Sequence, residues 1–218
     1  MNDQTAPSAS LATSARLATA EFFDRARARL NLDVPAALTD PAAQGVRRGD
    51  LDLDPVLWER AGVSATKPAA VLIPIIDRSE PTVLLTLRTA ELASHAGQVA
   101  FPGGKTDPAD QSPRDTALRE AEEELGITRA SADVLGVLDD YLTITGFVVT
   151  PWVAWLPADL AVRPNPAEVA RAFSPALRAF LAPPEGVLPW RGWTVDGELV
   201  WGATAAILRG FVAVVREL

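Results

Sequence analysis

Three of the four glutamates in residues 120–124 give this chain its clearest capacity for chemistry. Glu120, Glu123 and Glu124 lie close together after Arg119. On a helix, residues spaced i, i+3 and i+4 share one face, so the three carboxylates would fall within an arc of about 100°. They would repel one another, and Arg119 would offset only part of that repulsion. Such a cluster typically holds a hard divalent cation, because Mg²⁺, Mn²⁺ and Ca²⁺ prefer oxygen ligands. A solvated, salt-bridged helix face is the alternative interpretation.

Start and stop signals place these glutamates on a helix over residues 113–125. Ser112 is a favourable N-cap, Pro113 suits the first helical position, and Asp115 takes the acidic position of a capping box. Gly126 is a typical C-terminal stop. The apolar residues beside the carboxylates should pack on a sheet. They are Ala117, Leu118, Ala121 and Leu125.

The residues before this helix predict a ligand-contacting turn. Gly103 and Gly104 permit a tight turn in which backbone can approach a ligand closely, and Lys105 follows at once. Carbonyls, carboxylates and one lysine are therefore expected at a single place in the fold.

This stretch resembles the Nudix box. The resemblance rests on Gly104, an acid at Asp110, and the run Arg119-Glu120-Ala121-x-Glu123-Glu124-x-Gly126-Ile127. Asp110 stands where the box usually has Glu, and eight residues rather than seven separate it from Arg119. The preceding segments 84–92 and 95–104 resemble the signature of the coenzyme A pyrophosphatase subgroup, which shares both departures.

The resemblance implies roles for particular residues. Glu120 and Glu124 would be the main metal ligands, with Glu123 assisting and Gly104 adding its carbonyl, for Mg²⁺ or Mn²⁺. The general base stays open between Glu120, acting on a metal-activated water, and Glu168. A solvated loop glutamate is the alternative interpretation of Glu168. Arg119 should position Glu123 rather than contact the substrate.

Three further residues are candidates for substrate binding. Arg88 ends a predicted strand, where it would either clamp a phosphate or form a surface ion pair. His95 is the only histidine, and it lies in the subgroup signature, although a loop histidine is more often structural. Lys105 is the third candidate, since it follows the glycine turn.

The implied activity is metal-dependent hydrolysis of the diphosphate of coenzyme A or acyl-coenzyme A. The products would be 3′,5′-ADP and (acyl-)4′-phosphopantetheine. The nearest alternative is a Nudix hydrolase of another nucleoside diphosphate derivative, such as ADP-ribose. A non-catalytic Nudix-fold regulator that binds a ligand is a second alternative, and a scaffold protein that merely resembles the box is a third.

Composition limits the other function classes. The 218 residues are 48% hydrophobic, enough for one substantial core. A net charge of −8 argues against nucleic acid or an anionic membrane as the main partner. The absence of cysteine excludes disulfides and thiol nucleophiles, and it fits a reducing compartment. With no signal-peptide pattern and no apolar run of membrane length, we expect a cytoplasmic protein.

The first 65 residues lie outside the resemblance. Residues up to about Ser14 read as a disordered lead, and apolar spacing predicts a helix over 15–30. We interpret that helix as covering the domain, with a homodimer interface as the alternative. Residues 31–66 look irregular, apart from a short helix near 55–61.

Alternating and continuous apolar runs predict a sheet in the remaining chain. Pro74 in the first run implies a bulge or an edge position. Seven prolines make 157–189 mostly loop, and Asp196-Gly197 marks a hairpin turn. The predicted strands cover 69–77, 82–88, 133–145, 147–156, 190–195 and 198–201, and a final helix runs from 201 to 218.

We therefore expect one α+β domain over residues 66–218, with an N-terminal extension over 1–65. The Nudix resemblance implies an α/β/α sandwich, in which a mixed sheet lies between helices, and the strand and helix pattern is compatible with it.

Overall fold

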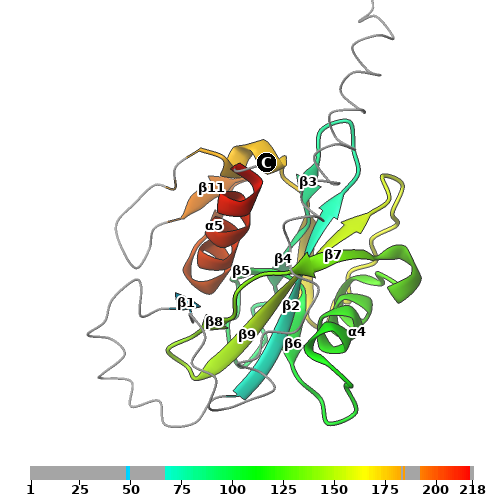
Figure 1. Cartoon of the computed structure of the whole chain (residues 1–218), viewed down its shortest axis with the longest axis vertical. Coiled ribbons are helices and arrows are strands. Elements are labelled where there is room, and N and C mark those ends of the chain that lie inside the picture. Colours follow the sequence, from blue (N-terminus) through cyan, green and yellow to red (C-terminus); the bar gives the residue numbers. More distant parts are fainter. Residues whose placement is uncertain (1–47, 50–66, 183, 185–191, 217–218) are drawn as a thin grey trace, which may run out of the picture.

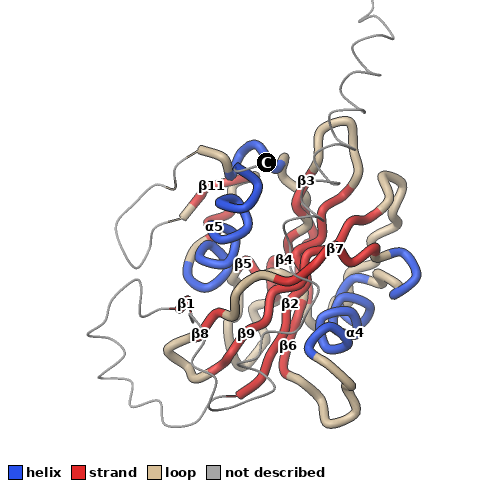
Figure 2. The backbone as a smooth tube through the Cα atoms, in the orientation of Figure 1, coloured by secondary structure: helices blue, strands red, loops and turns tan. Residues whose placement is uncertain are grey.

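The computed structural model describes residues 48–49, 67–182, 184 and 192–216. Within these ranges a mixed sheet lies between two long helices, with α4 (Pro113–Leu125) on one face and α5 (Gly202–Arg216) on the other (Figure 1). The expected α+β sandwich is confirmed. Figure 2 shows the strands running between the two helices.

Two ten-residue strands form the centre of the main sheet. β2 (Lys67–Ile76) and β9 (Phe147–Leu156) run parallel, with Lys67 opposite Phe147 and Ile76 opposite Leu156. Both are rich in β-branched residues, β9 also in aromatic ones, and both are largely buried, as expected for strands covered on both faces. The sheet order is β1-β8-β9-β2-β3, with β6 also on β2 and β7 also on β9. The flanking strands are β1 (Arg48–Gly49), β3 (Thr82–Val83), β6 (Gly103–Lys105), β7 (Asp133–Val137) and β8 (Tyr141–Leu142).

Pro74 occupies neither a bulge nor an edge strand, so that expectation was wrong. β2 is an interior strand, and its register on β9 continues through Pro74 without a shift. The other side of β2 is divided between β6 and β3. The carbonyl of Pro74 accepts a hydrogen bond from Leu84 in this gap (2.9 Å), so the missing N–H also faces the gap and leaves no ladder bond unmade.

A second, three-stranded sheet carries part of the site. β4 (Leu85–Arg88) pairs with β10 (Val169–Phe173) on one side and β5 (Val99–Ala100) on the other. The predicted strand 82–88 is therefore split at Leu84 between two sheets. Most described residues of 157–189 are loop, as predicted, but the prediction missed β10, in which Val169, Arg171, Ala172 and Phe173 pair with β4.

The segment 133–145 also differs from its prediction as one strand. It forms β7 and β8, which both pair antiparallel with β9. The segment thus pairs with 147–156 around Gly146, and a register shift occurs between Val134 and Gly136.

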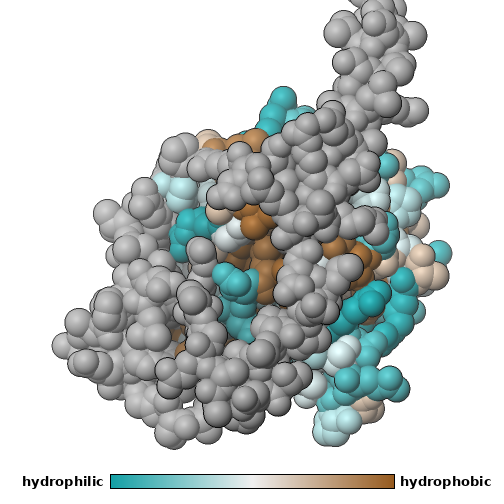
Figure 3. Space-filling view, viewed as in Figure 1, coloured by the Kyte–Doolittle hydropathy of each residue, from teal (hydrophilic) through white to brown (hydrophobic). Residues whose placement is uncertain are grey.

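Two apolar clusters hold the layers together. One joins α4 to the face of β2 that includes Ala70 and Leu72. The other joins α5 to the opposite face, which includes Ala69 and Ile73. Burial alternates along β2 in this way because successive side chains of a strand point to opposite faces. Figure 3 shows apolar side chains at the centre of this view and hydrophilic ones on the α4 side.

α4 has the predicted bounds because both ends carry strong local signals. The Ser112 hydroxyl accepts a hydrogen bond from the Asp115 N–H (3.2 Å), and Pro113 opens the helix. Gly126 adopts the left-handed conformation (φ 69°), and the Ile127 N–H donates to the Ala121 carbonyl. The cap fixes where the glutamates stand on the helix.

The C-terminal elements agree with their predictions. β11 (Trp193–Val195) and β12 (Glu198–Val200) form a hairpin turning at Asp196 and Gly197, both with positive φ. α5 buries Ile207, Phe211 and Val215. The predicted helices 15–30 and 55–61 lie outside the described residues. None of the described helices has the length and apolar character needed to cross a bilayer.

Candidate functional site

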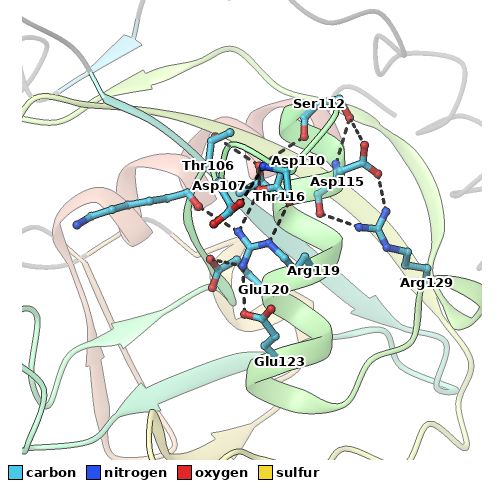
Figure 4. Close-up of polar contacts among 12 residues, drawn as sticks. Thr106, Asp107, Asp110, Ser112, Asp115, Thr116, Arg119, Glu120, Glu123 and Arg129 are labelled. Carbon is cyan, nitrogen blue, oxygen red and sulfur yellow. Dashed lines mark hydrogen bonds and ion pairs between the residues drawn. The ribbon is translucent and has the colours of Figure 1, made fainter.

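Arg119 organises the polar residues around the start of α4 (Figure 4). Its Nε and Nη2 bind the two oxygens of Asp110, each at 3.0 Å, and Nη2 also donates to the Lys105 carbonyl (3.1 Å). Its Nη1 donates to Glu120 (2.9 Å) and to Glu123 (3.1 Å). These five acceptors match the five N–H donors of a guanidinium, so Arg119 has no donor left for a substrate. The expected contact with Glu123 is present, and it is one of several.

Asp110 is the anchor of Arg119. Its side chain is 4% exposed, and it also accepts hydrogen bonds from the Asp107 N–H (2.9 Å) and the Thr116 hydroxyl (2.9 Å). The hydrogen bonds from Arg119, supported by those from Asp107 and Thr116, lower the pKa of Asp110 from 3.8 to about 2. An ionised Asp110 therefore fixes the guanidinium, which in turn fixes the carboxylates.

Gly104 provides space for Glu120. A Cβ at Gly104 would lie 2.4 Å from Oε1 of Glu120 and 2.5 Å from its carboxyl carbon, so a side chain cannot be accommodated unless Glu120 moves. Glu120 is mostly buried, and burial raises its pKa while the hydrogen bond from Arg119 opposes that rise. The predicted tight turn at residues 103–105 is wrong, because these residues form strand β6 on β2; the predicted close approach of this backbone to a carboxylate is present.

Glu124 is the most buried of the three glutamates, with 1% of its surface exposed. Its Oε1 lies 3.5 Å from Nη1 of Arg88, while its Oε2 is buried and has no hydrogen-bond partner. Burial raises the pKa of Glu124 to about 8, because the Arg88 charge and a hydrogen bond from the Gly103 backbone offset only part of the desolvation. An orphaned buried carboxylate oxygen is what a divalent cation would satisfy, so Glu124 fits the ligand role.

Glu168 approaches the same place from a different element. It is half-buried just before β10, where its neighbour Val169 pairs with Arg88. Its negative charge raises the pKa of both Glu120 and Glu124, so the three carboxylates act on one another through space. Glu168 therefore lies close enough to Glu120 and Glu124 for its charge to affect both carboxylates.

Asn165 fixes the loop that carries Glu168, and sequence reasoning gave it no role. Its N–H donates to the Glu124 carbonyl at the end of α4 (2.8 Å), and its side-chain oxygen accepts from the Ala167 N–H (3.1 Å). Its amide also lies 3.5 Å from Oε1 of Glu168. An Asn-Pro pair signals such a turn, but the Glu124 carbonyl that accepts from the Asn165 N–H is 41 residues earlier in the chain. The sequence alone could not show that contact.

The remaining candidates are less closely associated with the carboxylates. Glu123 has 54% of its side chain exposed and contacts Arg119. His95 is exposed in a loop, with φ 57°, and its Nδ1 lies 3.0 Å from Oε1 of Gln98. Lys105 contributes its carbonyl to Arg119, while its ammonium lies over the Phe147 ring. In the ranges that the structure describes, no three His, Cys, Asp or Glu side chains are already grouped at metal-binding spacing.

Comparison with known proteins agrees with this geometry. A family model for the NUDIX domain matches residues 66–197. The uncharacterized Nudix hydrolase NudL of Yersinia pestis (strain Pestoides F) is 45% identical over 171 residues, covering 72% of this chain and 84% of the relative. NudL of Yersinia pseudotuberculosis (serotype O:1b) matches to the same extent.

Solved structures support the fold. The Nudix hydrolase RenU of M. smegmatis has a TM-score of 0.53 at 21% identity, covering 71% of this chain and 88% of its own. The C. elegans Ap4A hydrolase in a binary complex has a TM-score of 0.51 at 19% identity, covering 70% of this chain and 100% of its own. With the matching family model and the 45% identical relatives, these findings show that the chain belongs to the Nudix hydrolase family.

Proposed function

We propose that this Nudix hydrolase cleaves the diphosphate of coenzyme A or acyl-coenzyme A, giving 3′,5′-ADP and (acyl-)4′-phosphopantetheine. Family membership supports hydrolysis of a nucleoside diphosphate derivative. The choice of coenzyme A is supported by the subgroup resemblance of residues 84–92 and 95–104, which form β4, β5 and the loop leading to β6.

The observation that carries the proposal is the incomplete pair formed by Arg88 and Glu124. Nε of Arg88 and Oε2 of Glu124 are both buried without a hydrogen-bond partner. A cation beside the carboxylate oxygen and a phosphate beside the guanidinium would satisfy both atoms. A diphosphate bound together with a divalent cation would supply both the cation and the phosphate oxygen.

The metal site would use Glu120 and Glu124, with Glu123 and the Gly104 carbonyl as further ligands. A divalent ion, Mg²⁺ or Mn²⁺, would neutralise the diphosphate charge and acidify the attacking water. Arg119 holds Glu120 in place and would not bind the substrate, since all five N–H donors of Arg119 are engaged. Nε of Arg88 would bind a diphosphate oxygen.

Glu168 is the stronger candidate for the general base. Water attacks phosphorus, a P–O bond of the diphosphate breaks, and the water proton must pass to a nearby base. Oε1 of Glu120 already accepts a hydrogen bond from Arg119 at 2.9 Å, so this oxygen is engaged. The described contacts of the Glu168 carboxylate comprise one long approach to Asn165, so its oxygens are more available.

A substrate panel tests the proposal. Coenzyme A, an acyl-coenzyme A, ADP-ribose and a dinucleoside polyphosphate are incubated with Mg²⁺, with Mn²⁺ and with excess EDTA, and the products are identified by mass. Coenzyme A should be cleaved fastest, to 3′,5′-ADP, and activity should require metal and rise toward mildly alkaline pH. Faster cleavage of ADP-ribose would overturn the substrate assignment, and full activity in EDTA would overturn the metal mechanism.

A cytoplasmic location and the alternative of a homodimer remain predictions from the sequence. Cell fractionation tests the first. Light scattering of the full chain and of a variant lacking residues 1–30 tests the second, because the predicted helix 15–30 is the proposed dimer element.

A further inference from the structure

Both lysines of this chain lie at one aromatic ring. The sequence has 20 basic residues, of which only Lys67 and Lys105 are lysines and the others are arginines. Each ammonium nitrogen is 5.7 Å from the centroid of the Phe147 ring. This distance is within the range of a cation–π contact. The chain has arginine at all its remaining Lys or Arg positions, and its two compact ammonium groups lie at the same ring.

The strand registers create this arrangement. Lys67 is opposite Phe147 in the β2–β9 pair, and Lys105 is opposite Ala69 in the β2–β6 pair. Residues 67 and 69 share one face of β2, so all these side chains lie on that face. The Phe147 backbone is held by Thr143, whose hydroxyl accepts from the Phe147 N–H at 2.9 Å. The ring therefore stands on a fixed strand end.

The two ammonium groups have no compensating carboxylate in the described part of the chain. Five arginines there form ion pairs with Asp or Glu, whereas neither lysine does. Both ammonium groups lie at the same ring, and the 28 Asp and Glu residues of the chain make carboxylates plentiful elsewhere. A pair of cations that has no counter-ion among the described residues of an acidic protein is suited to an anionic ligand, and ammonium groups suit a phosphate that need not be bound in a bidentate way.

β6 connects this pair to the carboxylates. Gly104 faces Glu120 on the α4 side, so the next side chain, Lys105, points to the opposite face. The Lys105 carbonyl accepts a hydrogen bond from Arg119 at 3.1 Å, and Arg119 also contacts Glu120 and Glu123. The lysine backbone is thereby linked to the carboxylates of α4. In the described residues β6 pairs only with β2, and Figure 1 shows it beside β2 near α4. A substrate at the carboxylates would therefore reach the lysines by crossing the edge of β6 that has no strand partner among the described residues.

We propose that Lys67 and Lys105, brought together at Phe147, bind a phosphate monoester of the substrate that is not cleaved. For coenzyme A this group is the 3′-phosphate, and its identity rests on the proposed function. The sequence suggested Arg88 and Lys105 as a clamp. Because Arg88 faces Glu124 at 3.5 Å, Lys67 takes the place of Arg88 in this site.

A footprinting experiment tests binding without catalysis. Lys67 and Lys105 are the only side-chain amines, so their acetylation can be followed individually by mass spectrometry of digested protein. Adenosine 3′,5′-bisphosphate at ten times its Kd should slow acetylation of both lysines about tenfold, whereas 5′-AMP at the same concentration should protect neither. Equal protection by the two nucleotides, or none by the bisphosphate, would overturn the site.

A kinetic experiment tests its role in selectivity. Lys67→Gln, Lys105→Gln and the double variant are compared with wild type on coenzyme A and 3′-dephospho-coenzyme A. The ratio of the two kcat/KM values should fall about tenfold for the double variant. Arg114→Gln is the matched control, since it removes one exposed positive charge from α4, and it should leave the ratio unchanged.

The two experiments separate the failure of this inference from failure of the proposed function. Equal losses on both substrates would show that the lysines do not read the 3′-phosphate, even if coenzyme A is the substrate. Selective protection by the bisphosphate in an enzyme that prefers ADP-ribose would retain the phosphate site and refute the coenzyme A assignment.

Discussion

Glu124→Gln should change how the stability of the metal-free enzyme depends on pH. Burial raises the pKa of this carboxyl from 4.5 to about 8, so the folded state favours its protonated form. Its contribution is therefore least unfavourable below pH 4.5, becomes more unfavourable as pH rises, and levels off above pH 8. At about 1.4 kcal/mol per pH unit, the cost is about 2 kcal/mol at pH 6 and about 5 kcal/mol at pH 9. Glutamine at this position has no such dependence.

Thermal unfolding in excess EDTA measures this difference. Between pH 6 and pH 9, wild type should lose up to about 3 kcal/mol more than Glu124→Gln, which corresponds to roughly 6–12 °C in Tm for a chain of this size. Comparing slopes with pH removes the constant cost of burying an amide. Mg²⁺ should restore wild type at pH 9 and leave the variant unchanged, and the variant should lose most activity.

The matched control is Glu123→Gln. It makes the same change in atoms on a side chain that is 54% exposed, so its Tm should follow pH as wild type does. If wild type and Glu124→Gln show the same pH dependence in EDTA, the burial argument for Glu124 is wrong. If the variant keeps normal turnover, its assignment as a metal ligand is wrong as well.

Three further substitutions test the surrounding residues. Gly104→Ala should lower kcat/KM about tenfold or more with little change in Tm, because the added Cβ would displace only the flexible end of Glu120. Gly210→Ala on α5 is the control: its Cβ would meet nothing within 4 Å, so activity should be unchanged. Arg119→Lys should also cost about tenfold or more in kcat/KM, measured at saturating Mg²⁺, because three donors cannot replace five. Asn165→Ala should reduce kcat about tenfold with little change in KM and shift the pH–rate profile, because Asn165 positions Glu168; an unchanged profile would reduce its role to loop stability.

The elements that the sequence predicted well are those with local signals. α4 has a hydroxyl cap, a proline and a left-handed glycine at its ends, so its bounds follow from nearest neighbours. β9 is a continuous apolar run. β10 was missed because prolines dominate its surroundings and only Val169 and Phe173 are buried, while its strand partner β4 is 81 or more residues earlier. Pairing with the distant strand β4 therefore decided the conformation of this segment, although its proline-rich composition favours loop.

The site shows the same division between local and non-local information. The spacing of the glutamates predicted a shared helix face, but it could not show that Glu124 is buried against Arg88 while Glu123 is exposed. Those environments depend on which strand ends meet α4. The convergence of the two lysines likewise depends on two strand registers, β2 on β9 and β2 on β6, and both would have to be known before the sequence could reveal it.

Asp110 and Glu124 affect the stability of the metal-free fold in opposite ways as pH rises. The lowered pKa of Asp110 stabilises the fold above pH 3.8 by about 2 kcal/mol, and that contribution disappears as pH falls through 2. The raised pKa of Glu124 destabilises the fold as pH rises toward 8. Between about pH 2 and pH 8, the Asp110–Arg119 pair fixes the positions of Glu120 and Glu123. In the same range Glu124 should keep its proton until a cation displaces it. Metal binding should therefore release close to one proton per site near pH 7, and proton release measured during titration with Mg²⁺ should disappear in Glu124→Gln but remain in Glu123→Gln.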